Sequence, residues 1–336
     1  MILVTGGTGL VGAHLLYKLI TSGKEVRALY RNENKLKHTK SVFSCYTEDY
    51  KPLFNAIEWV KADILDIPSL TEAFKGVTQV YHCAALVTFD PDKYQLLRRT
   101  NIEGTANMVN FSITNPVEKF CYVSSIATLG STLNNAPINE ETAWNPEEDN
   151  NLYAITKYGA EMEVWRGTQE GLNAVIVNPG VILGAGIWTY GTGNLFKKAH
   201  KGLKYYTAGT VALVDVEDVV AIMIQLTDSS IKNENFVLVS ENLTYKTFIQ
   251  ALAQAVNAKV PKKLANKNLL HIAWRLDWLR HTLFGKKRQL TKYVSRSLDS
   301  ETNYNSDKIK MALNYKFKAI DKSITEIGRL YLTQSN

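Results

Sequence analysis

The sequence has few cysteines, no long apolar run and no basic leader. Its three cysteines, Cys45, Cys83 and Cys121, stand far apart. An odd number at these spacings fits neither a disulfide framework nor a set of metal ligands, so we expect reduced thiols and no bound metal. No stretch reaches the roughly 18 apolar residues of a membrane-spanning helix. Because no signal peptide precedes Ile2, the expected location is cytoplasmic.

The charge of the chain is modest as well. The 336 residues carry a net charge of +7 with an isoelectric point near 9.0. This charge suits an anionic cofactor or substrate and is too small to indicate nucleic-acid binding. Hydrophobic residues make up 45% of the chain, enough for a sizeable core. The length suits a main domain with a smaller second one.

A glycine-rich stretch begins almost at the first residue. Ile2–Val4 predicts a short buried strand, glycines follow at Gly6, Gly9 and Gly12, and apolar residues then recur at helical spacing over 10–20. In such a strand–turn–helix unit, free backbone N–H groups and the positive end of the helix dipole point at one spot. The unit predicts a phosphate site, although a glycine turn alone can also be purely structural.

Apolar runs then alternate with helical stretches. Further strands are predicted over residues 25–30, 57–62, 79–83, 119–123 and 174–177, with a last one over 235–239. This alternation predicts an α/β fold with a doubly wound parallel sheet, whose ligands bind at the carboxyl ends of the strands. Residues 36–56 predict an irregular connection that contains a helix, and residues 94–114 predict one helix.

The end of the second predicted strand bears on the choice of cofactor. In dinucleotide folds an acidic residue there binds the 2′-hydroxyl of NAD, whereas a basic residue accommodates the 2′-phosphate of NADP. Here Tyr30 is followed by Arg31 and then Lys35, with no acid at the strand end. We therefore expect a preference for NADP, with NAD still possible; a solvated basic cluster is the alternative.

A tyrosine and a lysine stand four residues apart on a predicted helix. Tyr153 and Lys157 lie on one face, one turn apart. A free phenol has a pKa near 10, and a neighbouring cation lowers it. The pair occurs by chance on many helices, but here it follows Ser124 and Ser125 at the end of a strand of a dinucleotide fold. This combination indicates acid–base chemistry.

These motifs together resemble the extended short-chain dehydrogenase/reductase family, also known as the NAD-dependent epimerase/dehydratase superfamily. The resemblance rests on six segments of the sequence: Thr5–Gly12, Asp63–Asp66, Asn101–Asn107, Tyr153–Lys157, Asn178–Gly184 and Leu213–Val220. The second strand, the Ser-Ser strand end and Val181 resemble the dihydroflavonol-4-reductase-like and 3β-hydroxysteroid-dehydrogenase-like branch. The resemblance implies an NAD(P)-binding Rossmann fold with a smaller, mostly helical substrate lobe towards the C-terminus.

The resemblance also implies catalytic roles. Tyr153 would be the general acid/base, and Ser125, five residues before Gly130, would hydrogen-bond the substrate oxygen. Lys157 would lower the pKa of the tyrosine and hold the nicotinamide ribose. Asn101 would support a proton-relay water, with a plain helix-polar role as the alternative.

A larger set of residues is implied to contact the cofactor. Asp63 would contact adenine, whereas a helix cap at Asp66 or Ser69 is the alternative interpretation of that turn. The expected set is Gly6, Thr8, Gly9, Leu10, Val11, Gly12, Arg31, Lys35, Asp63, Ile64, Ala84, Ala85, Tyr153, Lys157, Pro179 and Val181.

Two departures from the family pattern concern the substrate. Asn178 replaces the usual arginine, and Val181 replaces an asparagine that many nucleotide-sugar enzymes use. The first hypothesis is therefore NADP(H)-linked interconversion of a ketone or aldehyde and an alcohol on a small, fairly apolar substrate. A nucleotide-sugar epimerase or dehydratase with bound NAD is the enzymatic alternative, and a non-catalytic NADP-sensing regulator is the alternative from another class.

The domain expectation follows from the same segments. Residues 1–178 form the NAD(P)-binding domain, to which residues 211–240 return, while residues 179–210 and 241–336 form the substrate lobe. Within the lobe, residues 269–284 form an apolar helical stripe followed by Lys286, Lys287 and Arg288. Packing of this stripe on the lobe, over the substrate pocket, is favoured over contact with a membrane surface. A homodimer is expected by analogy alone.

Overall fold

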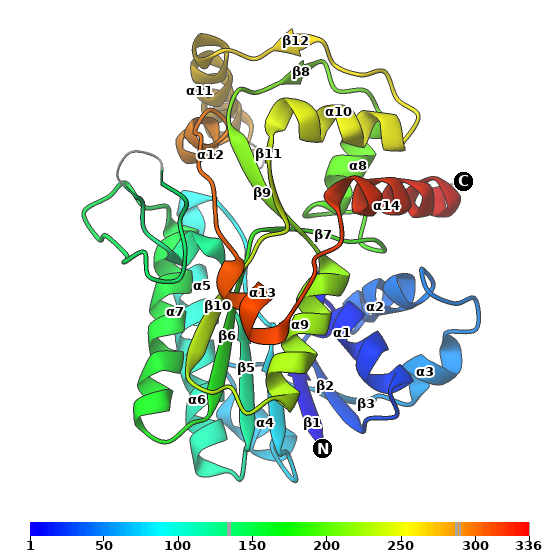
Figure 1. Ribbon diagram of the computed structural model, residues 1–336, viewed down its shortest axis with the longest axis vertical. Helices are drawn as coiled ribbons and strands as arrows, with labels where there is room; N and C mark the ends of the chain where they lie inside the picture. Colours follow the sequence, from blue (N-terminus) through cyan, green and yellow to red (C-terminus); the bar gives the residue numbers. More distant parts are fainter. Residues whose placement is uncertain (133–135, 286–287, 289, 336) are drawn as a thin grey trace.

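The computed structural model describes residues 1–132, 136–285, 288 and 290–335 (Figure 1). Among these residues, seven strands pair in parallel into one main sheet. Their spatial order is β10 (Glu234–Leu238), β6 (Ala174–Pro179), β5 (Lys119–Val123), β4 (Gln79–His82), β1 (Ile2–Thr5), β2 (Val26–Tyr30) and β3 (Glu58–Lys61). The doubly wound parallel sheet predicted from the sequence is confirmed.

Helices cover both faces of this sheet (Figure 1). One face carries α1 (Leu10–Thr21) and α9 (Val216–Asp228), and the other carries α4 (Ile67–Ala73), α6 (Gly104–Thr114) and α7 (Leu152–Gln169). The strand order reverses between β1 and β4, and such a reversal opens a crevice at the carboxyl ends of the strands.

Alternation along each strand divides the core into two layers. Ile2 and Val4 pack with the residues of α1 and α9, whereas Leu3 packs with those of α4, α6 and α7. Leu3 and Val4 are fully buried, because successive side chains of a strand point to opposite faces and both faces of this sheet are covered.

Two segments differ from the sequence prediction: residues 36–56 contain more helix than expected, and residues 94–114 do not form one continuous helix. Residues 36–56 form two helices, α2 (Leu36–Phe43) and α3 (Lys51–Asn55), whose Phe43 and Phe54 are buried beside α1. The single helix predicted over 94–114 is instead divided into α5 (Tyr94–Leu97), a π-helical segment η3 (Arg98–Glu103) and α6.

The rest of the chain builds a second lobe above the sheet (Figure 1). Its strands are β7 (Val181–Leu183), β8 (Tyr205–Tyr206), β9 (Thr210–Asp215), β11 (Glu241–Thr244) and β12 (Lys263–Leu264). Its helices include α8 (Gly193–His200), α10 (Tyr245–Ala255) and α14 (Ile320–Ser335), which share an apolar cluster, while α13 (Asp307–Leu313) packs beside β10. Thr244 caps α10, accepting a hydrogen bond from the backbone N–H of Thr247.

One prediction for this lobe is wrong. The stripe of α11 (Lys267–Phe284) is exposed rather than packed, because the helix meets the protein through its other side, where Leu270 is its only buried residue. It lies against α12 (Lys292–Ser297), at the outer edge of the lobe (Figure 1). Lys286 and Lys287 lie outside the described residues. No helix in the described ranges is long and apolar enough to cross a bilayer.

Candidate active site

The glycine turn between β1 and α1 is shaped by close backbone contacts. Gly6 has a φ of +70°, in the left-handed region that favours glycine, and its carbonyl oxygen accepts a hydrogen bond from the N–H of Gly9 at 2.8 Å. A Cβ on Gly12 would lie 2.3 Å from that same carbonyl oxygen. Both glycines are therefore required by the fold of the turn.

The same turn presents the start of α1 as an anion site. Gly9 is the N-cap and offers no side chain to the helix N–H groups, and the first turn contains no acidic residue. Backbone donors and the helix dipole thus remain available for a negative group. The turn fits the pyrophosphate of a dinucleotide on these grounds.

Neighbouring segments hold the glycine turn between β1 and α1 in place. The backbone N–H of Ala84, just after β4, donates to the Thr5 hydroxyl at 3.2 Å, and a Cβ on Gly6 would collide with Ala84. The buried Thr39 hydroxyl of α2 donates to the carbonyl oxygen of Gly7 at 2.9 Å. The ends of β1 and β4 and the start of α2 therefore meet at the predicted phosphate site.

The basic residues that follow β2 lie close to Asp63, an acidic residue from a different loop. Arg31 is 57% exposed, and its guanidinium lies 3.5 Å from the carboxylate of Asp63, beyond β3. Lys35 lies in the short helix that follows β2. Burial, Lys37 and Lys35 together lower the pKa of His38, so the positive potential extends to α2. The region predicted to bind the 2′-phosphate of NADP therefore contains basic side chains and one acidic side chain.

The loop that carries Asp63 is fixed by the Asn-x-x-Gly-Thr-x-Asn segment. The side chain of Asn107 donates to the carbonyl oxygen of Ile64 at 2.9 Å, and Ile64 is buried directly against Gly104. Asp66 accepts from the backbone N–H of Ser69 at 3.1 Å and caps α4. The cap interpretation therefore holds for Asp66, while Asp63 keeps a partly exposed carboxylate.

Ser125 and Tyr153 meet at the carboxyl end of β5. Ser125 starts the short helix η4 (Ile126–Thr128), and Tyr153 lies in the first turn of α7, which Asn151 caps. Both side chains are partly exposed. Burial raises the pKa of the Tyr153 phenol, and the neighbouring Ser125 side chain opposes that rise. The phenol therefore stays protonated at neutral pH.

Ser124 faces the other way. Its hydroxyl donates to the Glu161 carboxylate at 2.5 Å, and the same oxygen accepts from Thr128 at 2.8 Å and from Asn178 at 2.9 Å. Glu161 is only 4% exposed, so three donors satisfy a buried carboxylate. Asn178 also donates to the backbone oxygen of Ser125 at 3.3 Å. This cluster holds the Ser124–Ser125 strand end and leaves Ser125 facing Tyr153.

The Lys157 ammonium is held by β5. It donates to the phenol oxygen of Tyr122 at 2.5 Å and to the carbonyl oxygen of Val123 at 2.8 Å. Burial lowers the pKa of Lys157 to about 7, against the opposing pull of Glu161. Within the described part of the chain, no hydrogen bond joins Lys157 to Tyr153. The predicted influence of Lys157 on the tyrosine stays a prediction.

His82 connects Tyr122 to the glycine turn through buried contacts. The imidazole of His82 is hydrogen-bonded to Thr5 at 2.7 Å and to Thr105 at 3.0 Å, and it stacks on the Tyr122 ring. Burial and the Lys157 charge lower the pKa of His82 to about 3. His82 is thus a neutral structural residue that links the phosphate site to the lysine.

Asn101 is buried in the π-helical segment. Its amide nitrogen donates to the carbonyl oxygen of Leu86 at 3.1 Å and to the Thr156 hydroxyl at 3.2 Å, while its oxygen accepts from the N–H of Leu86 at 2.8 Å. It therefore connects the segment after β4 to α7, one residue before Lys157. The predicted water relay is compatible with this position, since π-helical turns are frequent at functional sites.

Aromatic residues border the phenol on its open side. Phe89 lies edge-on to Tyr153, with ring centroids 5.8 Å apart, and stacks on Tyr293 of α12 at 6.2 Å. Val87 and Val181 are 62% and 37% exposed. Pro179, at the end of β6, is buried. The residue that contacts the Tyr153 ring at this rim, Phe89, is therefore aromatic.

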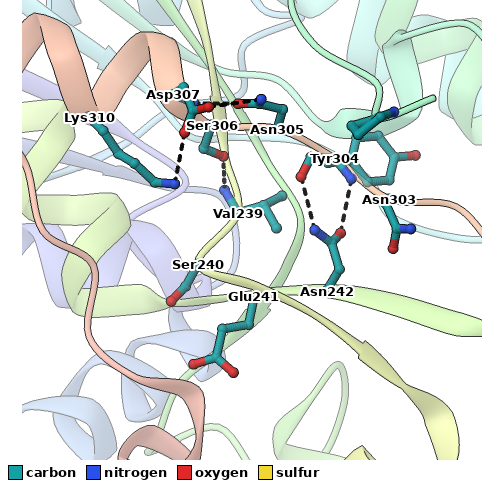
Figure 2. Close-up of a pocket in the computed structure, with 11 residues that line it drawn as sticks. Val239, Ser240, Glu241, Asn242, Asn303, Tyr304, Asn305, Ser306, Asp307 and Lys310 are labelled. Atoms are coloured by element: carbon teal, nitrogen blue, oxygen red, sulfur yellow. Dashed lines mark hydrogen bonds and ion pairs between the residues drawn. The ribbon is translucent and has the colours of Figure 1, made fainter.

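A separate polar pocket of about 260 Å³ opens where β10 meets β11 and α13 (Figure 2). Asn242 exchanges hydrogen bonds with the backbone of Tyr304, and Ser306 accepts from the N–H of Val239. None of the residues expected to bind cofactor or to act in catalysis lines this pocket. Its polar groups tie the two lobes together.

Two further expectations concern the cysteines and metals. All three cysteines are free thiols. In the described ranges, no cluster of three or more His, Cys, Asp or Glu side chains could hold a metal ion.

Comparison with known proteins places these features in a family. The model of the NAD dependent epimerase/dehydratase family matches residues 2–238. The chain belongs to this family. It is an NAD(P)-dependent enzyme of the short-chain dehydrogenase/reductase type, as the sequence motifs implied. The resemblance inferred from the sequence motifs is confirmed. The family description names epimerases and dehydratases, and reductases occur among the curated relatives, so the reaction class stays open between the three.

Curated relatives resemble the chain over most of its length. Sterol demethylase protein B of Methylococcus capsulatus is 27% identical over 298 residues, which cover 87% of this chain and 86% of that protein. A protein of Synechocystis, provisionally named a dihydroflavonol 4-reductase, is 25% identical over 331 residues, covering 97% and 88%.

Solved structures share the fold. The crystal structure of gox2253 has a TM-score of 0.81 and 25% identity, covering 100% of this chain and 98% of that one. That of the dTDP-glucose 4,6-dehydratase DesIV from Streptomyces venezuelae, with NAD bound, has a TM-score of 0.76 and 18% identity, covering 100% and 97%.

Several residues of the site were missed by sequence reasoning. Glu161 stands four residues after Lys157 on α7, and this spacing alone would have flagged it as a neighbour. Tyr122, Phe89 and Tyr293 carry no local signal, since each reaches the site through contacts between distant segments.

Proposed function

We propose that this protein is an NADP(H)-dependent oxidoreductase that interconverts a ketone or aldehyde and the corresponding alcohol on a small, fairly apolar substrate. The observation that carries the proposal is the closeness of Ser125 and Tyr153, two partly exposed side chains from separate elements, with Ser125 opposing the rise that burial causes in the pKa of the phenol. Lys157 stands one helical turn away. This arrangement suits proton transfer to or from one substrate oxygen.

The chemistry follows from the state of each group. Because burial raises its pKa, the Tyr153 phenol keeps its proton at neutral pH and can donate it to a carbonyl oxygen as negative charge develops there. The Ser125 hydroxyl donates a second hydrogen bond to the same oxygen and stabilises that charge. When bound, the cofactor supplies or accepts the hydride.

The chain's own groups would hold that cofactor. Backbone N–H groups at the start of α1 would bind the pyrophosphate, and Lys157 would reach the nicotinamide ribose. Arg31 and Lys35 would bind the 2′-phosphate of NADP. Asp63 partly neutralises Arg31. The proposed preference for NADP therefore rests on the basic side chains of this region outnumbering the single Asp63 carboxylate.

The rim favours an apolar substrate over a nucleotide sugar. Phe89 and Tyr293 offer aromatic surface beside the phenol. Val181 cannot hydrogen-bond a diphosphate through its side chain. The nucleotide-sugar alternative would need polar or basic groups at this rim.

The cofactor part is tested by calorimetric titration of the purified protein with NADPH and with NADH. We expect tighter NADPH binding, a preference that Arg31→Leu reduces by about tenfold through loss of a charge-assisted contact. Lys24→Leu, an exposed lysine at the opposite end of β2, is the matched control and should leave the preference unchanged. Equal or tighter binding of NADH would contradict the 2′-phosphate argument and favour an epimerase or dehydratase with bound NAD.

The catalytic part is tested by Tyr153→Phe in a screen of ketones and aldehydes that follows NADPH oxidation. Turnover should fall by about 10²–10⁴ while NADPH affinity is kept, because only the proton donor is lost. Tyr158→Phe on the same helix, whose ring stacks on Trp144, is the control. Undiminished turnover in Tyr153→Phe would refute the assignment, and cofactor binding without any turnover in the unmodified protein would favour a regulator.

A further inference from the structure

The helix α11 presents an apolar stripe to the outside. Its members follow one another at intervals of three and four residues and are between 37% and 64% exposed: Leu269, Ile272, Leu276, Leu279 and Leu283. Trp278 and Phe284 beside the stripe are 49% and 71% exposed. A continuous exposed apolar surface of this kind marks a site that contacts a membrane or another protein.

The opposite side of α11 fixes the helix to the protein. Leu270 is buried, and the Asp277 carboxylate accepts from the backbone N–H of Leu290 at 3.0 Å. Lys267 pairs with Asp299 at 3.2 Å at one end, and His281 lies 3.4 Å from Asp92 at the other. The stripe is therefore held in one orientation, at the outer edge of the lobe (Figure 1).

A groove of about 470 Å³ runs along this helix. The described residues that line it, Trp274, Arg275, Leu276, Trp278 and Leu279, all belong to α11. No other element of the described chain forms a wall of the groove, so the surface faces outward.

The positive charge of the sequence is concentrated in and around α11, where Lys267, Arg280 and Arg296 are each paired with an aspartate. Residues 259–296 contain 11 lysines and arginines and a single acidic residue, Asp277, so their net charge is +10. Since the chain as a whole carries +7, all its other residues together carry −3. An apolar stripe within a strongly basic segment, on an otherwise slightly acidic protein, complements a surface that is both apolar and anionic.

The charges beside the stripe argue against a second copy of the helix as the partner. Arg275 beside the stripe is exposed and positive, whereas Arg280 pairs with Asp277 at 2.7 Å. If the apolar stripes of two α11 helices packed together, positive side chains beside the two stripes would approach each other. Paired helices instead place opposite charges beside their apolar contact. Tryptophan and phenylalanine beside a leucine stripe, with arginines at its edges, suit the boundary between lipid headgroups and acyl chains.

We propose that α11 docks this protein on an anionic lipid bilayer, lying in the plane of the interface. The leucine stripe enters the boundary of the acyl chains, and the basic residues around it lie among the lipid phosphates. This surface is separate from the catalytic side chains, and the proposal does not depend on the reaction assigned to them.

The experiment is co-sedimentation of the full chain with vesicles of equimolar phosphatidylcholine and phosphatidylglycerol, and with vesicles of phosphatidylcholine alone. The protein should bind the anionic vesicles and release them as salt is raised. Leu276→Glu should abolish binding, and Arg275→Glu should weaken it by at least about tenfold, because each basic residue near an anionic surface contributes about fivefold. Met311→Glu, a 78% exposed residue on α13, is the matched control and should bind like the unmodified protein.

Other results would overturn the proposal. Equal binding to both kinds of vesicle, or none to either, would remove the anionic bilayer as the partner. A dimer in sedimentation velocity that Leu276→Glu converts to monomer, without vesicle binding, would assign the stripe to a second copy. A large loss of thermal stability in Leu276→Glu, absent from Met311→Glu, would mean that the stripe is packed and not free to dock.

Discussion

Replacement of Lys157 by methionine should change how the stability of the protein depends on pH. Lys157 is 1% exposed, and burial lowers its pKa from 10.5 to about 7. Between these two values the unfolded chain binds a proton at this site that the folded chain does not. The free energy of unfolding therefore rises with pH across this window.

The size of the effect follows from the two pKa values. From pH 6.5 to 9 the folded lysine loses its proton while the unfolded one keeps it, which adds about 2–3 kcal/mol to the stability of the unmodified protein. Lys157→Met has no proton to lose and similar bulk, so its stability should lack this increase. Titrating groups that do not interact with Lys157 contribute equally to both proteins and cancel in the difference.

The assay is urea denaturation at several pH values between 6.5 and 9, comparing the unmodified protein with Lys157→Met. Lys75→Met, a 65% exposed lysine on the surface, serves as the control and should follow the unmodified protein. If the curves for Lys157→Met and the unmodified protein stay parallel over this range, the ammonium is not penalised by burial and the reasoning is refuted.

Three further predictions concern other parts of the site. Glu161→Gln should lower the free energy of unfolding by about 2–3 kcal/mol in urea denaturation, because three charge-assisted hydrogen bonds to one buried oxygen become neutral ones; an unchanged midpoint would contradict this. Gly12→Ala should weaken NADPH binding at least about tenfold in calorimetric titration, since its Cβ would lie 2.3 Å from the Gly6 carbonyl oxygen and open the turn; retained affinity would refute that geometry. His14 of α1 is buried and hydrogen-bonded to Tyr46 and to the carbonyl oxygen of Ala185. From pH 6.5 down to 4.5, thermal or urea denaturation should show a loss of about 2 kcal/mol for each of His14 and His82, because burial lowers their pKa values to about 4 and about 3 and the unfolded chain binds their protons more readily; constant stability over this range would show that they titrate normally.

Much of the cofactor half could be predicted because its signals are local. The glycine spacing at Gly6, Gly9 and Gly12 needs only the geometry of one turn, and the alternation of apolar strands with helical segments needs only periodicity. The same holds for the placement of Tyr153 and Lys157 one turn apart on one helix. Backbone geometry within a few residues carries each of these signals, so no knowledge of distant contacts was required.

Contacts between distant segments decided the rest. Asp63 lies beside Arg31, Tyr122 and not Tyr153 holds Lys157, and Phe89 stands between the phenol and α12 only because separate strands and loops end at one edge of the sheet. The same limit explains the error at α11. Periodicity identifies an apolar face, but whether that face is covered depends on where the rest of the chain packs, and here the chain packs against the other side of the helix.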